Sequence, residues 1–451
     1  PNPAAKAANT EAANTESTNE TDPSPAVGQD HERVARLRAH YAPLLERIRE
    51  GAARRDQTRE LPRQEIRDLA AAGFGALRVP QEYGGEGLTV PEFFELVTDL
   101  AAADSNLAQA LRGHFALVED RLLAPLGASR DRWLRRFVAG EIAGNAWTEV
   151  GSTQLGGVNT VVTRHEDGTA TVTGEKYYST GSIFADWIDV WSRDAATGED
   201  VISLVSTRQD AVELSDDWTG FGQRTTGTGT TVFRAAKVEE VVPVTERFRY
   251  QTALYQQVLL SVLAGVARAA SRDVGAVLAA RKRGYSHGNA EETSRDPQLL
   301  AVVGEVDSAA FAAAAVSARA AEALQGAYDA GVALRAAQDS VPDGEDVALR
   351  TEALRVADDA AVDRAELATA QGQVALSTSV PAAVTRLFDA LGASATDTGT
   401  DLDRHWRNAR TAASHNPWVY KARIVGEHVV HGEAPVRLWS VGKTSAASSA
   451  V

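Results

Sequence analysis

The spacing of hydrophobic residues changes twice along this chain of 451 residues. From residue 33 to about residue 144 apolar side chains recur at helical spacing. Between about Asn145 and Pro243 short alternating runs, such as Trp187–Trp191, are separated by Gly, Asp and Thr. From residue 247 to about 392 the helical spacing returns in an Ala-rich sequence. This order predicts an α+β fold, in which a small antiparallel β domain, a barrel or sandwich, separates a helical domain from a helical bundle.

Composition places the domain boundaries. Residues 1–28 are rich in Ala, Asn, Thr, Glu, Ser and Pro and almost lack large apolar side chains, so we expect a disordered tail. A helical domain over 29–144, a β domain over 145–243 and a C-terminal four-helix bundle with a final loop and tail over 244–451 follow. We expect turns at Pro43 and in the glycine-rich stretch 82–87. We also expect helix breaks near 286–297 and 341–345.

Charge and hydropathy exclude several classes of partner. The net charge of −15 argues against nucleic acid or an anionic membrane as the main partner. We expect no apolar run of the roughly 20 residues that span a bilayer, and the first residues do not resemble a secretory signal. We therefore expect a cytoplasmic protein. The histidines show no metal-like spacing with carboxylates, so no metal site is expected.

The chain contains neither cysteine nor methionine. A disulfide, a thiol nucleophile and a thiolate metal site are therefore impossible. Three explanations are open: removal of sulfur by engineering, avoidance of side chains that a peroxide-forming site would oxidise, and synthesis under sulfur starvation. We favour the third, because the motifs below also point to sulfur metabolism.

Four motifs occur in a fixed order. They are Leu77–Leu88 (LRVPQEYGGEGL), Ala146–Ser152 (AWTEVGS), Gly174–Gly181 (GEKYYSTG) and Gly220–Gly229 (GFGQRTTGTG). Each is weak alone, but in this order they resemble the motifs of the acyl-CoA dehydrogenase family over about residues 45–430. The resemblance implies an acyl-CoA dehydrogenase-like fold that binds a flavin between the β domain and the C-terminal bundle.

The same resemblance implies a set of flavin-binding residues. Short hydroxyl side chains suit the polar edge of the flavin ring and an aromatic side chain suits its face, although Ser and Thr are also common on solvent-facing strands. In such a helix Arg407 and Arg410, together with Arg404, either contact the flavin or form intersubunit salt bridges. Arg283 follows Arg281 and Lys282. It either reaches a flavin phosphate across a subunit interface or belongs to a solvated helix end. The complete set is Trp147, Thr148, Ser179, Thr180, Gly181, Trp218, Arg224, Arg283, Arg407, Asn408 and Arg410.

The C-terminal loop separates two chemistries. Many acyl-CoA dehydrogenases carry there a glutamate that removes the substrate α-proton. Here the helix Asp403–Thr411 is followed by Ala412–Trp418, which holds His415 and Asn416 and no carboxylate. An imidazole with an ordinary pKa near 6.5 replaces the acid. The pattern resembles the flavin monooxygenases of this fold, especially the dibenzothiophene monooxygenase group.

This resemblance implies a two-component monooxygenase. A separate flavin reductase would supply reduced FMN, and one oxygen atom of O2 would pass from a C4a-hydroperoxyflavin to a small organosulfur compound. His415 would hydrogen-bond to or protonate the oxygenated flavin, with His114 and Thr180 as further catalytic residues. The alternatives are that His415 caps a helix and that His114 is a packed or surface histidine. A homotetramer is expected from the family.

Other functions remain open at this level. One is an FAD-dependent enzyme similar to acyl-CoA dehydrogenases, which the missing glutamate disfavours. Oxygenation of a nitrogen or of an aromatic ring would use the same fold. A third possibility is a non-catalytic structural or binding protein that has lost its cofactor.

Overall fold

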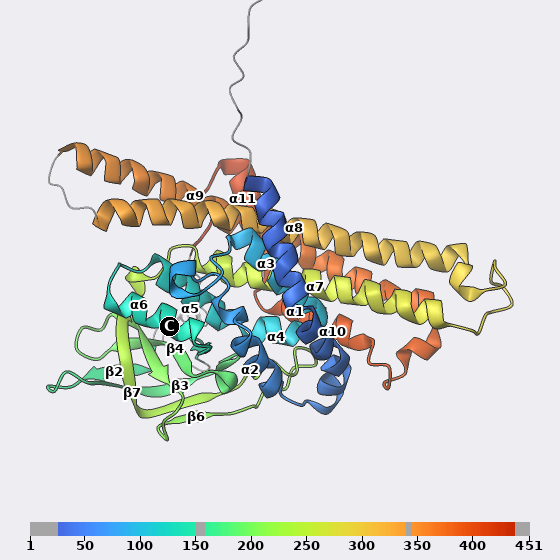
Figure 1. The fold of residues 1–451 in the computed structure, drawn as a ribbon, viewed down its shortest axis with the longest axis horizontal. Helices are drawn as coiled ribbons and strands as arrows, with labels where there is room; N and C mark the ends of the chain where they lie inside the picture. Colours follow the sequence, from blue (N-terminus) through green and yellow to red (C-terminus); the bar gives the residue numbers. More distant parts are fainter. Residues whose placement is uncertain (1–25, 150–157, 340–344, 438–451) are drawn as a thin grey trace, which may run out of the picture.

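A computed structural model describes residues 26–149, 158–339 and 345–437. The chain runs through helices, then a sheet, then long helices, as its periodicity predicts, and the long helices cross the whole molecule (Figure 1). The prediction of a disordered tail over residues 1–28 is wrong for residues 26–28, which are helical. Residues 1–25 lie outside the described residues. The N-terminal helices are α1 (Ala26–Thr58), α2 (Arg63–Ala71), α3 (Val90–Ala103), α4 (Ser105–Ala110), α5 (Arg112–Leu123) and α6 (Ala128–Val138).

The prediction of a turn at Pro43 is wrong, because α1 continues through this residue. Proline inside a helix removes one hydrogen bond and crowds the preceding turn, at a cost of about 3 kcal/mol. Pro43 lies on the exposed face, whereas Tyr41, Leu44 and Ile48 beside it are buried in the core. Burial of this apolar face outweighs the local preference of proline.

The glycine-rich stretch before α3 forms the predicted turn. Gly84 and Gly87 have φ angles of 97° and 63°, which favour glycine. A Cβ on Gly85 would lie 2.1 Å from the Val79 carbonyl oxygen, so the chain packs there without room for a side chain. Helix α3 then begins with a capping box, in which Thr89 and Glu92 each accept a hydrogen bond from the other's backbone N–H.

The middle of the chain forms a closed barrel rather than a sandwich. Strand β4 pairs with β2 and β5, and the ladder β2–β3–β7–β5 completes the ring, while β1 adds to β4 and β6 to β7. The prediction of a purely antiparallel domain is wrong, because β1 and β2 run parallel to β4. The strands are β1 (Ala143–Ala146), β2 (Val161–Arg164), β3 (Ala170–Lys176), β4 (Trp187–Asp194), β5 (Asp200–Ser206), β6 (Val212–Leu214) and β7 (Thr231–Pro243).

Three long helices and two shorter ones form the described C-terminal part. Helix α7 is the core helix, and both α3 and α8 pack against it. The helix breaks predicted near 286–297 and 341–345 are confirmed by the ends of the long helices. The helices are α7 (Gln251–Ala280), α8 (Pro297–Asp339), α9 (Glu345–Leu391), α10 (Asp403–Ser414) and α11 (Trp418–His431).

Two of these helices, α7 and α8, are long and apolar enough to cross a membrane by length and composition. The expectation that no such run exists is therefore wrong. For α7 the reason is burial, since 89% of its apolar window lies inside the protein, as in the core helix of a soluble protein. In α8 only 17% of the window is buried, and Phe311 is 77% exposed. Helix α8 thus presents a long Ala-rich apolar face outside the fold.

Candidate functional site

An aromatic cluster joins the barrel to the bundle. Trp147 follows β1, and its Nε1 donates a hydrogen bond to Asp189 Oδ1 on β4 at 2.9 Å. Its ring meets Trp191 of β4 edge-on, with centroids 5.2 Å apart, and Tyr255 of α7 at 5.4 Å. Trp147, which was predicted as an aromatic wall for a flavin, therefore lies where the two predicted halves of the site meet.

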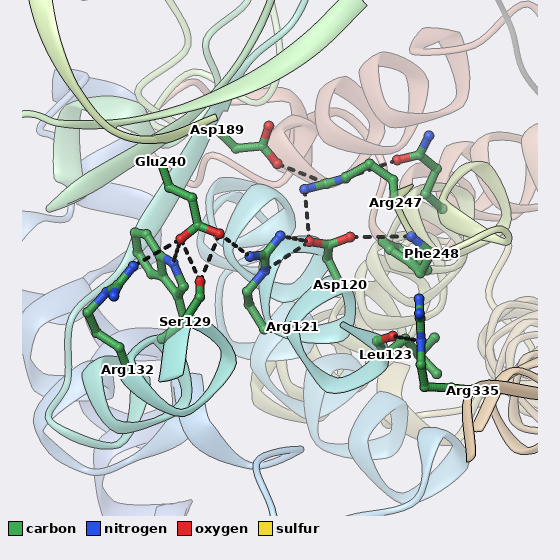
Figure 2. Close-up of polar contacts among 12 residues, drawn as sticks. Asp120, Arg121, Leu123, Ser129, Arg132, Asp189, Glu240, Arg247, Phe248 and Arg335 are labelled. Atoms are coloured by element: carbon green, nitrogen blue, oxygen red, sulfur yellow. Dashed lines mark hydrogen bonds and ion pairs between the residues drawn. The ribbon is translucent and has the colours of Figure 1, made fainter. Parts of the chain in front are cut away.

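A chain of buried charges holds this junction in place (Figure 2). Arg247, just before α7, forms ion pairs with Asp189 at 2.9 Å and with Asp120 of α5 at 3.5 Å. Arg121 continues the chain from Asp120 at 2.5 Å to Glu240 of β7 at 3.1 Å. Of these groups only Glu240 is more than marginally exposed to solvent. The network therefore connects the N-terminal helices, the barrel and α7 through charge pairs.

This network is not predicted by any motif or hydrophobic pattern of the sequence. Its members occur in segments whose hydrophobic pattern looked like ordinary core, as in Ile188-Asp189-Val190. A charged residue between two buried apolar residues of a strand is the available signal, because charges are almost never fully buried without partners. The partners themselves are far apart in the sequence, as Asp120 and Arg247 are, so no local pattern identifies them.

The GEKYYSTG motif is held by an ion pair. Lys176, at the end of β3, is buried and lies 2.6 Å from Glu149 of the preceding motif. Glu149 also accepts hydrogen bonds from the backbone N–H groups of Asn159 and Thr160. Burial lowers the pKa of Lys176, although Glu149 opposes the change. The two motifs are therefore joined in space; residues 150–152 of the AWTEVGS motif lie outside the described residues.

The predicted hydroxyl residues lie together at the end of β3. Ser179 and Thr180 are buried; the Ser179 hydroxyl has no hydrogen-bond partner among the described residues, and Thr180 Oγ1 lies 2.9 Å from Thr228 Oγ1. Gly181 has a φ of 78°, and a Cβ there would lie 1.9 Å from the Ala110 carbonyl oxygen. Gly181 is therefore explained by backbone packing against α4. The neighbouring Thr148 is half-buried and bridges to this segment through its backbone.

Trp218 is half-buried beside the same segment. Its Nε1 donates to the Gly222 carbonyl oxygen at 3.1 Å, and its ring meets the exposed Tyr178 edge-on at 6.0 Å. Tyr178 has a φ of 59°, which is uncommon for a bulky residue and indicates local backbone strain. This strained turn directs the chain from β3 into Ser179 and Thr180.

The loop with His415 packs on α7 and α9. Asn416 Nδ2 donates to Gln256 Oε1 of α7 at 3.0 Å, and Gln373 of α9 donates to the Asn416 carbonyl oxygen at 2.8 Å. Asn416 thus turns its Oδ1 towards His415 Nδ1, 3.4 Å away. The surrounding protein, together with the positive charge of Arg112, lowers the pKa of His415, whose side chain is nevertheless open to solvent. The lowered pKa favours the neutral form of the His415 imidazole at neutral pH.

The arginines of α10 have partners within the chain. Arg407 forms ion pairs with Asp56 at 2.7 Å, Asp401 at 2.8 Å and Asp403 at 2.7 Å, and Arg404 pairs with Asp273 at 2.7 Å. These contacts give Arg407 and Arg404 structural roles that require neither a flavin phosphate nor a second subunit. We therefore leave them out of the candidate site.

Three further predicted residues lie around α10. Asn408 Oδ1 accepts a hydrogen bond from the Gln223 backbone N–H at 2.7 Å, which ties α10 to the GFGQRTTGTG motif. Arg224 of that motif lies 3.9 Å from Asp56. Arg410 is half-buried, and its guanidinium forms no hydrogen bond or ion pair within the described ranges. Of these three, Arg410 is the one whose side chain is available to a cofactor.

Arg283 is far from this site within one chain. It is exposed, and it follows α7 at the opposite end from Gln256. A helix rises 1.5 Å per residue, so the two ends of this part of α7 are about 36 Å apart. Arg281 beside it donates to the carbonyl oxygens of Ala390 and Leu391 at the end of α9. Arg283 can therefore reach a flavin only in another copy of the chain.

His114 is a core histidine and lies outside the candidate site. It is fully buried on α5; its Nε2 donates to the Gly75 carbonyl oxygen at 2.9 Å, and its Nδ1 accepts from the Ala143 backbone N–H at 3.1 Å. Both ring nitrogens are thus used in joining α5 to the barrel. The packed alternative explains this residue, and the structure gives no geometry for catalysis.

The buried neutral state of His114 predicts acid sensitivity. Burial lowers its pKa to about 4, whereas the unfolded chain has a pKa near 6.5. Between these values the unfolded state binds more protons, so the free energy of unfolding falls as the pH is lowered from about 6.5 to 4, by up to roughly 3 kcal/mol. In urea titrations at several pH values, His114→Gln is expected to flatten this slope. An unchanged slope would exclude His114 as its source; His405, with a pKa of about 4, contributes in the same direction.

Two family models match the chain. The acyl-CoA dehydrogenase N-terminal domain matches residues 35–141, and the acyl-CoA dehydrogenase C-terminal domain matches residues 328–418. The chain is 27% identical over 435 residues to a dibenzothiophene monooxygenase of Rhodococcus erythropolis, covering 91% of this chain and 96% of that protein. It is 26% identical over 394 residues to a probable FMNH2-dependent monooxygenase, SfnC, of Pseudomonas putida, covering 85% and 92%.

Solved structures share the fold. TdsC from Paenibacillus sp. A11-2, in complex with FMN and indole, superposes with a TM-score of 0.76 at 23% identity, over 91% of this chain and 99% of that chain. The methanesulfinate monooxygenase MsuC of Pseudomonas fluorescens gives a TM-score of 0.74 at 23% identity, over 89% and 98%. The predicted arrangement of helical domain, β domain and helical bundle is therefore confirmed.

Proposed function

Since this chain belongs to the acyl-CoA dehydrogenase superfamily, we propose that it is a flavin-dependent monooxygenase of sulfur metabolism. Reduced FMN from a separate reductase and O2 would be its co-substrates, and a small organosulfur compound its substrate. The observation that carries the proposal is the loop of His415 and Asn416, which is fixed on α7 and α9 beside the aromatic cluster. The proposal is supported by relatives that are named monooxygenases and that this chain matches over most of their length.

The same loop argues against acyl-CoA dehydrogenation. Residues 412–418 contain no carboxylate, and the first turns of α7 beside them present Tyr255, Gln256 and Gln257. A base that removes an α-proton is therefore missing from both segments. The carboxylate of Glu366 is buried instead under the start of α7, where it accepts a hydrogen bond from the Ala253 N–H, and burial raises its pKa against the opposing charge of Lys421.

The residues at the barrel edge fit a flavin. The buried hydroxyl of Ser179, which lacks a described partner, and the hydroxyls of Thr180 and Thr228 match the polar edge of the ring. Trp147 would provide an apolar face, and Arg410 a cation for the phosphate. When bound, reduced FMN supplies the two electrons that activate O2 for transfer of one oxygen atom. The other oxygen atom leaves as water.

His415 would accept and pass on a proton beside the reacting atoms. Because its Nδ1 faces an amide oxygen, the ring proton is on Nδ1 and the lone pair of Nε2 is free. A neutral imidazole in this form accepts a hydrogen bond or a proton at Nε2. The thioether or other soft sulfur of the substrate is itself the nucleophile, so the protein need only orient it and exclude water.

We further propose that the enzyme is a homotetramer. The exposed apolar face of α8 suits the Ala-rich face of another copy, and Arg283 can contribute to a flavin site only from another copy. Sedimentation at micromolar concentration measures the assembly, and a monomer under these conditions would contradict the proposal.

The function is tested with purified protein, photoreduced FMN and air. We expect oxygenation of organosulfur compounds in a ratio of one O2 consumed per product, with reduced FMN preferred over reduced FAD. Firm binding of FAD together with reduction of that flavin by an acyl thioester would instead show a dehydrogenase. Failure to bind any flavin, oxidised or reduced, would show a non-catalytic protein. Amines and aromatic rings in parallel assays distinguish oxygenation of nitrogen or carbon.

A further inference from the structure

Two buried arginines act on Tyr255 through their charge, but among the described residues only one of them has carboxylate partners. Arg247 is paired with Asp189 and Asp120. Arg112, the first residue of α5, is 8% exposed, and its Nε is buried without a hydrogen-bond partner. Its guanidinium carbon lies 5.0 Å from the centroid of the Tyr255 ring. In the described part of the chain Arg112 has no ion pair, so it is an uncompensated buried cation.

Such a cation is costly to the folded state. Removing a charge from water without a partner is unfavourable, and the contact with an aromatic face compensates only part of it. Burial lowers the pKa of Arg112 to about 10, so the group still carries its charge at neutral pH. The hydroxyl of Tyr255 is also buried without a described partner, and burial raises its pKa, so it remains a donor. Two donors are thus held together without an acceptor.

The position of this pair is at the candidate site. The Tyr255 ring meets Trp147, and Tyr255 precedes Gln256, which holds the His415 loop through Asn416. The charge of Arg112 also acts on His415, whose pKa it lowers. Arg112 and Tyr255 therefore lie on the side of the aromatic cluster that faces the His415 loop. In the proposed reaction the substrate, which accepts the oxygen atom, binds on this side.

We propose that Arg112, with the Tyr255 hydroxyl, binds an oxyanion of the substrate, and that the substrate is an organic sulfinate. The inference rests on the proposed function and names its substrate class. A guanidinium and a hydroxyl suit the two oxygens of a sulfinate, and the sulfinate sulfur keeps a lone pair that can take an oxygen atom. In the balanced reaction RSO2⁻, reduced FMN and O2 give RSO3⁻, oxidised FMN and water. Sulfur is oxidised by two electrons, and the flavin supplies the two electrons that reduce the second oxygen atom.

The phosphate of FMN is the other oxyanion that an arginine recognises. We assign Arg112 to the substrate because its neighbours are the aromatic ring of Tyr255 and the His415 loop rather than the hydroxyl-rich end of β3. The two sources differ experimentally, since a phosphate contact discriminates FMN from riboflavin and a substrate contact does not.

The test compares benzenesulfinate with methyl phenyl sulfoxide, which has nearly the same size and no charge. Both are oxygenated at sulfur, and kcat/KM is measured with photoreduced FMN in air. In the Arg112→Gln variant we expect the preference for the sulfinate over the sulfoxide to fall on the order of 10- to 100-fold. Arg135→Gln, which makes the same charge change at an exposed position of α6, is the matched control and should keep the preference.

Two measurements separate binding from folding and from turnover. Calorimetry of benzenesulfinate with flavin-free protein should show binding that Arg112→Gln weakens and that Tyr255→Phe weakens less. The thermal midpoint of Arg112→Gln should equal or exceed that of the unmodified protein, because an uncompensated buried charge is removed; a purely structural arginine would lower it.

The outcomes are distinct. Equal losses for both compounds, absent sulfinate binding, or a loss of FMN affinity without loss of riboflavin affinity would each overturn the inference. Oxygenation of both compounds with an unchanged preference for the sulfinate in Arg112→Gln would overturn the inference while leaving the proposed monooxygenase function intact. Binding of sulfinate through Arg112 without oxygenation of either compound would instead refute the proposed function.

Discussion

Replacing His415 by alanine is expected to lower the rate of oxygen transfer on the order of 10²- to 10⁴-fold, the usual effect of losing a positioned proton acceptor. The neutral ring offers its Nε2 lone pair beside the aromatic cluster, and alanine offers nothing there. The protein itself should be unaffected, because the His415 side chain is open to solvent and its described hydrogen bond is a long one to Asn416. Product formed in a single turnover with reduced FMN and O2 measures the effect.

The control for this variant is His431→Ala. His431 is an exposed histidine at the end of α11 and should be replaceable without effect. Flavin reoxidation followed in the same samples shows whether O2 still reacts when product is lost. If His415→Ala kept full oxygenation, the histidine would have no catalytic role, and its position at the end of α10 would be explained by capping alone.

Replacing Asp189 by asparagine is expected to lower the free energy of unfolding by about 3–5 kcal/mol. Asparagine keeps the size of the side chain and can still accept the hydrogen bond of Trp147, but it removes the charge 2.9 Å from Arg247. Arg247 would then be buried with only the more distant Asp120 as a counter-charge. Urea unfolding followed by tryptophan fluorescence measures both the stability and the environment of Trp147.

Two further variants make the result specific to the network. Asp210→Asn changes an exposed carboxylate of the β domain and should alter the unfolding free energy by no more than about 0.5 kcal/mol. The double variant Asp189→Asn, Arg247→Gln removes both charges and should be more stable than the sum of the two single changes predicts. Additive effects would show that the pair does not couple the barrel to α7.

The large-scale fold follows from local patterns. Hydrophobic periodicity and the four motifs lie within short stretches of sequence, and each reports a local structure such as a helix face, a strand or a glycine turn. These stretches predict the order of domains and the ends of the long helices. Pro43 shows the limit of local rules, because burial of Tyr41 and Leu44 overrides the preference of proline for a turn.

Local sequence patterns predict only part of the candidate site. Trp147 and His415 could be selected because each stands in a motif. His114 was selected from the family resemblance, but its role depends on the Gly75 carbonyl and the Ala143 N–H, which the fold brings to its two nitrogens. The ion pairs of Arg407 with Asp56 and Asp401 likewise give it a structural role that its motif does not reveal.

The sequence by itself thus indicated the resemblance to a family, the succession of helices and strands, and the absence of a carboxylate from the C-terminal loop. The tertiary structure decided which charges are paired. Asp120, Asp189 and Arg247 meet only after three parts of the chain have packed, since ion pairing depends on distance in space and not along the chain. The same packing leaves Arg112 buried beside Tyr255 without a counter-charge, a property that no reading of residues in order can reveal.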